Sequence, residues 1–262
     1  MIQQLLIIDA LNLIRRFYAV SEKQFQDPKA LLAATFNQTH QGIIRLLQQF
    51  NPSHVVTVFD SGQPDWRQQI DPQYKANREP MPQPLKDALT SFQDQLLDVG
   101  IDSLSNPGIQ ADDLIATLAC KADSHQLASV IVSTDQGYWQ LLDHPFIQIY
   151  DYFKRQFIDA HTVYEKFQLQ TQQLIDYWAM IGSSSVNLKG VPGIGPKSAL
   201  KLLHQYQTLH NILQLKSQDR LVLKVQQYHQ EAKQTAQLMQ LQTQLSLGFK
   251  LNQIRYHAIE SS

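Results

Sequence analysis

The sequence has few of the features that mark an extracellular or membrane-bound protein. It contains a single cysteine, Cys120, which excludes an internal disulfide and a zinc site built from several cysteines. No stretch approaches the roughly 18 consecutive apolar residues that cross a bilayer. The amino terminus has neither a basic segment nor a small-residue cleavage site, so we expect no signal peptide. We therefore expect a cytoplasmic protein that does not enter a membrane.

The chain also lacks an excess of charge of either sign. Its 22 Lys+Arg and 23 Asp+Glu residues give a formal charge of −1, which excludes a uniformly basic nucleic-acid-binding surface but allows local patches. With 43% apolar residues over 262 positions, the chain can form an ordinary packed core. This length predicts one large domain or a large and a small one.

The hydrophobic pattern changes along the chain. Short apolar runs at 5–8, 55–59, 130–133 and 146–150 predict strands, and helical stripes at 85–96 and 114–122 lie between them. The first three runs are continuously apolar, which is typical of strands that are covered on both faces. This alternation predicts an α/β domain with a mostly parallel sheet flanked by helices over residues 1–160. A helical domain is predicted for 161–262, with helices near 161–168, 172–180, 197–205 and 225–245.

Three of the predicted strands are followed by an aspartate, namely Asp9, Asp60 and Asp135. The carboxyl ends of neighbouring parallel strands share one edge of a sheet, where ligands bind. A single aspartate after a strand is more typical of a helix N-cap than of a metal site. Asp112 and Asp113 open the helix at 114–122, where acidic residues also interact well with the helix dipole. Together they favour a hard divalent metal and phosphoryl-transfer chemistry, because clustered carboxylates repel one another without a cation.

A glycine-rich segment, GVPGIGPKS at 190–198, separates two predicted helices. Its spacing differs from that of a Walker A loop, and it suits a turn whose backbone approaches a phosphate at the start of the next helix. Contacts of this kind recognise the DNA backbone and not its sequence. The alternative is a tight loop between packed helices.

Six motifs occur in a common order: LLIIDALNLIRR, VFD, YKANR, QADDLIA, VSTDQGYWQLL and GVPGIGPKSA. In this combination the chain resembles the 5′-nuclease/flap endonuclease family over almost its whole length. The resemblance implies a PIN-like α/β nuclease domain with a helical arch near 74–100, and a C-terminal helix–three-turn–helix DNA-binding domain. It also implies Mg²⁺-dependent hydrolysis of DNA at 5′ flaps, nicks or junctions. We expect a monomer that needs no small-molecule cofactor.

The resemblance assigns roles to individual residues. It implies that Asp9, Asp60, Asp112, Asp113 and Asp135 hold Mg²⁺, and that Lys75 and Arg78 act with Asp112 in catalysis. The DNA-binding residues it implies are Tyr74, Lys75, Arg78, Gly193, Ile194, Gly195, Pro196, Lys197 and Ser198. It further implies a K⁺ ion held by the backbone carbonyls of Met180, Ile181, Lys189, Val191 and Ile194. The basic surface could extend to Arg15 and Arg16, although solvated arginines explain these two equally well.

The chain departs from the family pattern at several carboxylates. Gln110 replaces the usual glutamate before Asp112, while Gly137, Ser183 and Val186 stand where three carboxylates of a second metal site would be. Our hypothesis is that the second metal is missing or weakly held, and that the first binds less tightly because of Gln110.

Two functions remain open from the sequence. The first is a structure-selective 5′-nuclease with one firmly held metal, and the second is a weakly catalytic or non-catalytic binder of branched or flapped DNA. A third, a metal-dependent phosphatase, leaves YKANR and GVPGIGPKSA unexplained.

Overall fold

Six strands form one sheet at the centre of the computed structural model, which describes residues 3–256. The order across the sheet is β3-β2-β1-β4-β5-β6, and all neighbours are parallel except β5 and β6. The strands are β1 (Gln4–Asp9), β2 (His54–Val58), β3 (Asp102–Leu104), β4 (Ala128–Val132), β5 (Ile147–Asp151) and β6 (Gln156–Ile158). The four predicted strands are confirmed, whereas the short β3 and β6 were not predicted because three residues carry too little pattern.

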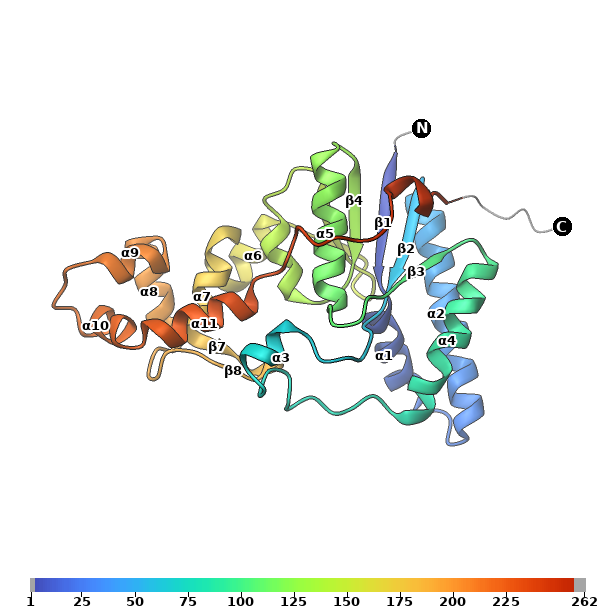
Figure 1. Cartoon of the computed structure of the whole chain (residues 1–262), viewed down its shortest axis with the longest axis horizontal. Helices are drawn as coiled ribbons and strands as arrows, with labels where there is room; N and C mark the ends of the chain where they lie inside the picture. Colours follow the sequence, from blue (N-terminus) through green and yellow to red (C-terminus); the bar gives the residue numbers. More distant parts are fainter. Residues whose placement is uncertain (1–2, 257–262) are drawn as a thin grey trace.

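Helices cover both faces of this sheet (Figure 1). In β1, Leu6 and Ile8 pack with α1, α2 and α4 on one face, while Leu5 and Ile7 pack with α5 on the other. Successive side chains of a strand point to opposite faces, so two covered faces require an unbroken apolar run. The continuous LLII segment is thus explained by its central place in the sheet.

The α-helices vary widely in length along the chain. They are α1 (Ala10–Ser21), α2 (Pro28–Phe50), α3 (Trp66–Ile70), α4 (Gln83–Asp98), α5 (Ala111–Ser124), α6 (Ala160–Phe167), α7 (Leu174–Ile181), α8 (Pro196–Tyr206), α9 (Leu209–Gln214), α10 (Arg220–Gln227) and α11 (His229–Met239). Short 3-10 turns lie at Gln136–Leu141, Thr171–Gln173, Ser184–Val186 and Leu251–Ile254. No helix within residues 3–256 has both the length and the apolar character needed to span a membrane.

Helix α4 occupies most of the region in which a helical arch near 74–100 is predicted, but it lies flat against α2. Its buried side chains are Leu85, Phe92 and Leu96, and the ring of Phe92 stacks on Phe36 of α2 with centroids 4.6 Å apart. The apolar side of α4 is therefore buried against α2 and the sheet, and the helix does not form an arch over the site. Residues 71–82, which contain no helix, make the crossing from α3 to α4 that is visible at the bottom of Figure 1.

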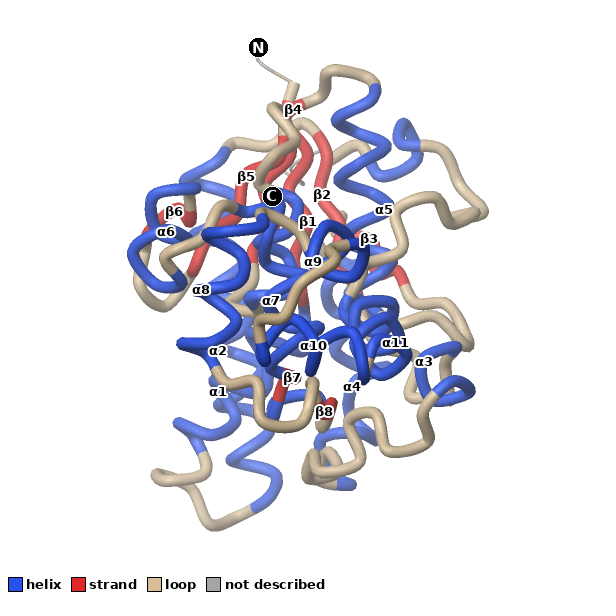
Figure 2. The backbone as a smooth tube through the Cα atoms, turned by 90° about the vertical axis from the view of Figure 1, so that its left-hand side faces the viewer, coloured by secondary structure: helices blue, strands red, loops and turns tan. Residues whose placement is uncertain are grey.

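The second half of the chain is helical from α6 onward, apart from the small hairpin of β7 (Gly182–Ser183) and β8 (Leu188–Lys189). Figure 2 views this half of the molecule from its outer end, and Figure 1 shows α7 and α11 beside the hairpin and α9 and α10 farther out. The prediction of one helix over 225–245 is wrong. The helix breaks at Tyr228 between α10 and α11, and it ends at Met239 because the following residues bind side chains of the first half.

The last described residues return to the sheet. After α11 the chain crosses α5 and reaches β2 (Figure 1), where Arg255 bridges His54 and the Tyr256 N–H donates to the Ser53 carbonyl at 3.0 Å. Ile254 is buried in this contact. The described residues after α11 therefore include a segment that packs on the central sheet and not on the C-terminal helices.

Candidate active site

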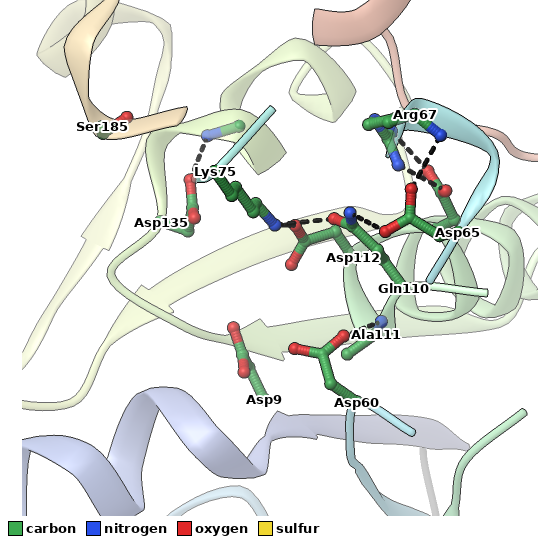
Figure 3. A network of polar contacts seen from close by, with 12 residues as sticks. Asp9, Asp60, Asp65, Arg67, Lys75, Gln110, Ala111, Asp112, Asp135 and Ser185 are labelled. Carbon is green, nitrogen blue, oxygen red and sulfur yellow. Dashed lines mark hydrogen bonds and ion pairs between the residues drawn. The ribbon is translucent and has the colours of Figure 1, made fainter. Parts of the chain in front are cut away.

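The strand-end aspartates meet at one edge of the sheet because their strands are neighbours. The strands β2, β1 and β4 lie side by side, and Asp60, Asp9 and Asp135 stand at or just after their carboxyl ends. Figure 3 shows these carboxylates around one opening, with Asp112 of α5 above Asp9 and Asp60. The predicted convergence of residues that are far apart in the sequence is present.

Local hydrogen bonds fix each of these carboxylates. Asp9 caps α1 by accepting from the Asn12 N–H at 3.2 Å, and its second oxygen accepts from the Ser133 hydroxyl at 2.9 Å. Asp135 accepts from the Gly137 N–H at 2.7 Å, and Asp60 accepts from the Ala111 N–H at 2.7 Å at the start of α5. The N-cap interpretation and the site interpretation thus hold together, since capping orients the same carboxylates toward the opening.

Tyr138 links two of the carboxylates. Its hydroxyl lies 3.1 Å from Asp112 Oδ1 and 3.4 Å from Asp9 Oδ2, and the residue is buried. Burial and the charges of Asp9 and Asp112 raise the pKa of Tyr138 well above its ordinary value, so it stays a donor. Sequence analysis did not single out Tyr138, although it lies in the VSTDQGYWQLL motif.

The electrostatics of the site favour a bound cation. Burial, together with the charge of Asp112, raises the pKa of Asp9 to about 8. The same two causes raise the pKa of Asp60 and that of Asp135. Burial opposes ionisation of Asp112 as well, but the charges of Lys75 and Arg67 lower its pKa. Negative charge at this edge exceeds what the surrounding groups neutralise, which is the condition that a divalent ion relieves.

The spacing of the carboxylates fits an ion that keeps part of its water shell. Across residues 3–256, no three Asp, Glu, His or Cys side chains are grouped closely enough to ligate one ion together. Mg²⁺ commonly binds through one or two carboxylates and retains several waters. The donor set here therefore fits Mg²⁺ held partly through water and does not fit a cage made only of protein ligands.

Asp113 does not belong to this donor set, contrary to the prediction. Its fully buried carboxylate forms two hydrogen bonds with the Arg67 guanidinium at 2.7 and 2.8 Å, and it also accepts from Trp66 Nε1 and the Gln242 N–H. Asp112, one position earlier, faces the opening. Because neighbouring helix residues point about 100° apart, only one of the pair can reach the metal site.

Lys75 points into the carboxylate cluster. Its Nζ donates to Gln110 Oε1 at 2.6 Å and to Asp112 Oδ2 at 3.3 Å (Figure 3). The Gln110 amide nitrogen donates in turn to Asp65, the N-cap residue of α3. Gln110 thus binds a lysine and an aspartate.

The segment around Lys75 is docked on the loop at 184–187. Arg78 Nε donates to the Ser185 carbonyl at 3.1 Å, and Asn77 Nδ2 donates to the Ser184 carbonyl at 2.8 Å. Tyr74, predicted to contact DNA, is instead buried among Val186, Leu188 and Leu238. Its ring anchors the segment, and only 4% of its surface is exposed.

Uncharged residues occupy the three positions where the resemblance implies carboxylates for a second metal, and all three line one cavity. A cavity of about 80 Å³ lies beside Asp112 and Asp135, and Gly137, Ser183 and Val186 form part of its wall. A Cβ on Gly137 would lie 3.2 Å from Asp135 Oδ1, so a carboxylate at this position would crowd Asp135. None of these three side chains carries the negative charge that a second divalent ion would need.

The glycine-rich segment forms the turn that leads into α8. Gly195 is the N-cap residue and has no side chain to cap the helix, and Gly193 adopts a φ of 75°. The side chain of Ile194 is buried, so this residue shapes the turn, while Lys197 and Ser198 lie in the first turn of α8. Lys224 of α10 places its ammonium directly against Gly193, which adds a second cation that sequence analysis did not find.

Three of the five carbonyls assigned to K⁺ already accept one hydrogen bond each. The Met180 carbonyl accepts from the Val191 N–H at 2.8 Å, and the Val191 carbonyl accepts from the Ile194 N–H at 3.0 Å. The Lys189 carbonyl accepts from Thr235 Oγ1 at 2.9 Å. Because a carbonyl oxygen has two lone pairs, one such bond does not by itself prevent a carbonyl from binding an ion.

Comparison with known proteins places both halves of the chain. A family model for the N-terminal resolvase-like domain of 5′-3′ exonucleases matches residues 4–168, and one for their C-terminal SAM fold matches residues 169–262. A protein named flap endonuclease Xni from Psychromonas ingrahamii is 47% identical over 258 residues, which is 98% of each chain. Its namesake from Aeromonas salmonicida is 43% identical over 255 residues, or 96% of each chain.

Solved structures agree on the fold. The bacteriophage T5 5′-exonuclease with bound zinc ions has a TM-score of 0.74 at 21% identity, covering 92% of this chain and 90% of that one. The T5 flap endonuclease in a pseudo-enzyme-product complex with DNA and metal ions scores 0.72 at 20% identity with the same coverage. The catalytic core of Rad2 with DNA substrate scores 0.56 at 20% identity, covering 87% of this chain and 73% of that one. The predicted fold class, a mostly parallel α/β domain followed by a helical domain, is confirmed.

Proposed function

Because the chain belongs to the 5′-3′ exonuclease family and is a structure-selective 5′-nuclease, we propose that it cuts DNA near 5′ flaps, nicks or junctions with one Mg²⁺ ion bound at Asp112. The observation that carries this proposal is the convergence of Asp9, Asp60, Asp112 and Asp135 at one sheet edge, with raised pKa values for the three strand-end carboxylates. A capping role alone would not require these aspartates to converge on one opening.

In the proposed mechanism the metal ion, when bound, stabilises charge on the phosphate and makes water a better nucleophile. Asp112 would hold the ion, and Asp9, Asp60 and Asp135 would support it directly or through water. Tyr138 keeps Asp112 and Asp9 at a fixed separation through its hydroxyl. Lys75 carries positive charge into the same opening, and Arg78 lies near enough for its charge to offset part of the rise in the pKa values of Asp60 and Asp135. The scissile phosphate would lie beside these two cations.

The turn at 193–198 would hold the DNA at a distance from the cut. The backbone N–H groups of Lys197 and Ser198 open α8, and the start of a helix attracts a phosphate. The side chains of Lys197 and Ser198, with Lys224 nearby, add donors for the same strand. Such contacts do not read bases, which suits selection by DNA structure. A K⁺ ion at the carbonyls of Met180, Ile181, Lys189, Val191 and Ile194 would brace this turn.

The proposal assigns a monomer that acts in the cytoplasm and needs metal ions but no small-molecule cofactor. The neutral wall formed by Gly137, Ser183 and Val186 supports a single firmly held divalent ion. With one ion in place of two, turnover should be slower than in a relative that has every ligand.

A flap duplex tests this function. The wild type should release the 5′ flap when Mg²⁺ is added, and Asp112→Ala should lower the rate by at least about 10³-fold while leaving DNA affinity unchanged. Asp94→Asn, an exposed change on α4, serves as the control and should cut normally. Cleavage that survives Asp112→Ala would exclude this site as the reaction centre.

A further inference from the structure

Lys75 is held in the site as firmly as the carboxylates. Only 16% of its side chain is exposed, and its Nζ lies between Gln110 Oε1 and Asp112 Oδ2 at 2.6 and 3.3 Å. Asp112 itself is 25% exposed at its side chain. A surface ion pair of two flexible side chains contributes little, but this pair is largely removed from water and has a third partner.

The backbone around Lys75 prevents the side chain from swinging away easily. Lys75 adopts a left-handed φ of 57°, and its N–H donates to the Val186 carbonyl at 2.9 Å. Asn187 Nδ2 also donates to the Gln73 carbonyl at 2.8 Å. With the bonds from Asn77 and Arg78 described above, segment 73–78 is attached to loop 184–187 from both sides.

Gln110 has the chemistry that a lysine-binding position needs. Its oxygen faces Lys75 and its nitrogen faces the Asp65 carboxylate, so both ends of the amide are satisfied. A glutamate in the same place would set a second negative charge against Asp65. The substitution of the family's glutamate thus fits a bridge from Asp65 to Lys75.

Two of the positions that lack the family's carboxylates, Ser183 and Val186, lie close to segment 73–78. Val186 belongs to the loop at 184–187 and packs with the buried Tyr74, and Ser183 of β7 lines the same cavity as both residues. We propose that the Lys75 ammonium is a built-in counter-ion of Asp112 that competes with the divalent ion for this carboxylate. The inference rests on the proposed metal site at Asp112, because one divalent ion must then share that carboxylate with Lys75.

Metal titration of the protein without DNA tests this proposal. Isothermal titration with Mn²⁺ should show that Lys75→Met binds the ion about tenfold or more tightly than the wild type, since a competing positive charge is removed. Lys75→Gln, which keeps a hydrogen-bonding end but no charge, should behave in the same way. Lys86→Met, at an exposed position on α4, should match the wild type.

Flap cleavage at saturating Mn²⁺ supplies the second measurement. Lys75→Met and Lys75→Gln should cut at least about tenfold more slowly despite tighter metal binding, because the fixed positive charge at the phosphate is lost. A merely structural lesion would weaken metal binding and cleavage together, and that result would overturn the counter-ion role.

The outcomes separate this inference from the proposed function. Unchanged Mn²⁺ affinity in both Lys75 variants, with binding still lost in Asp112→Ala, would overturn the counter-ion and leave the metal site standing. Mn²⁺ binding that is unaffected by Asp112→Ala would overturn both.

Discussion

At the scale of single residues, the site is a group of carboxylates whose charge is incompletely balanced. Asp9 is the most buried of the strand-end aspartates, and its nearest polar partners are neutral hydroxyls and a backbone N–H. Lys75 forms an ion pair with Asp112, whereas Asp9 forms no ion pair within residues 3–256. Without metal, therefore, Asp9 should destabilise the folded protein when it is ionised.

The stability of the metal-free protein should therefore depend on pH, and Asp9→Asn should reduce this dependence. Burial and the charge of Asp112 raise the pKa of Asp9 to about 8, while its unfolded value is near 3.8, so the folded state binds more protons between these limits. The free energy of unfolding should fall as pH rises through that window, by at most about 1.4 kcal/mol per pH unit from this group.

Asparagine keeps the cap and cannot ionise. In metal-free urea denaturation at pH 5 and pH 8, Asp9→Asn should therefore gain stability over the wild type as pH rises. Parallel profiles for the two proteins would contradict the assigned pKa. Asp60 and Asp135 keep part of the slope in the variant, because their pKa values are raised as well.

At the scale of elements, two adjacent aspartates in the first turn of α5 have different roles. Asp112 faces the opening, while Asp113 binds Arg67 of α3, whose guanidinium also donates to the Leu238 and Gln240 carbonyls at 2.8 and 2.9 Å. Three segments from both halves of the chain therefore meet at one buried ion pair. This pair sets the position of α5 and hence that of Asp112.

Removal of Arg67 should be strongly destabilising. Arg67→Met leaves the Asp113 carboxylate buried and unpaired, a change that typically costs about 3–5 kcal/mol. Thermal unfolding should show a drop in Tm of about 10 °C. The double variant Arg67→Met, Asp113→Asn should recover part of the loss, because the stranded charge is gone. A shift as small as that of the exposed control Asp94→Asn would contradict this role.

The contrast between Asp112 and Asp113 shows what sequence could predict. The strand-end carboxylates were predictable, because parallel topology alone brings Asp9, Asp60 and Asp135 to one edge. The role of Asp113 depends on Arg67, which is 46 positions away and carries no local signal for that pairing. The predicted DNA contact of Tyr74 and the predicted arch at 74–100 differ from the structure for the same reason. Tyr74 packs on the β7–β8 hairpin and α4 packs on α2, and only the fold brings these partners together.

At the scale of the whole molecule, the proposed function assigns DNA contacts to two separate regions. The carboxylate edge belongs to the sheet, whereas the turn before α8 belongs to the helical half, and the ion pair between Arg67 and Asp113 joins the two regions. Binding and chemistry should consequently respond to different substitutions.

Lys197→Ala tests this separation. Loss of one phosphate contact should weaken DNA binding at low salt and reduce the salt dependence of log K by about one unit of slope. In flap cleavage KM should rise with kcat nearly unchanged, whereas Asp112→Ala should act on kcat alone. Unaltered DNA affinity in Lys197→Ala, measured by fluorescence anisotropy, would remove the turn from the DNA interface.

A single divalent ion beside Asp112 is best tested by diffraction from crystals soaked in metal. Crystals soaked in Mn²⁺ and measured at the manganese absorption edge should show one anomalous peak in the opening between Asp112 and the strand-end carboxylates. Two peaks about 3.5–4 Å apart, the spacing of a two-metal nuclease, would contradict the account, as would manganese bound only elsewhere.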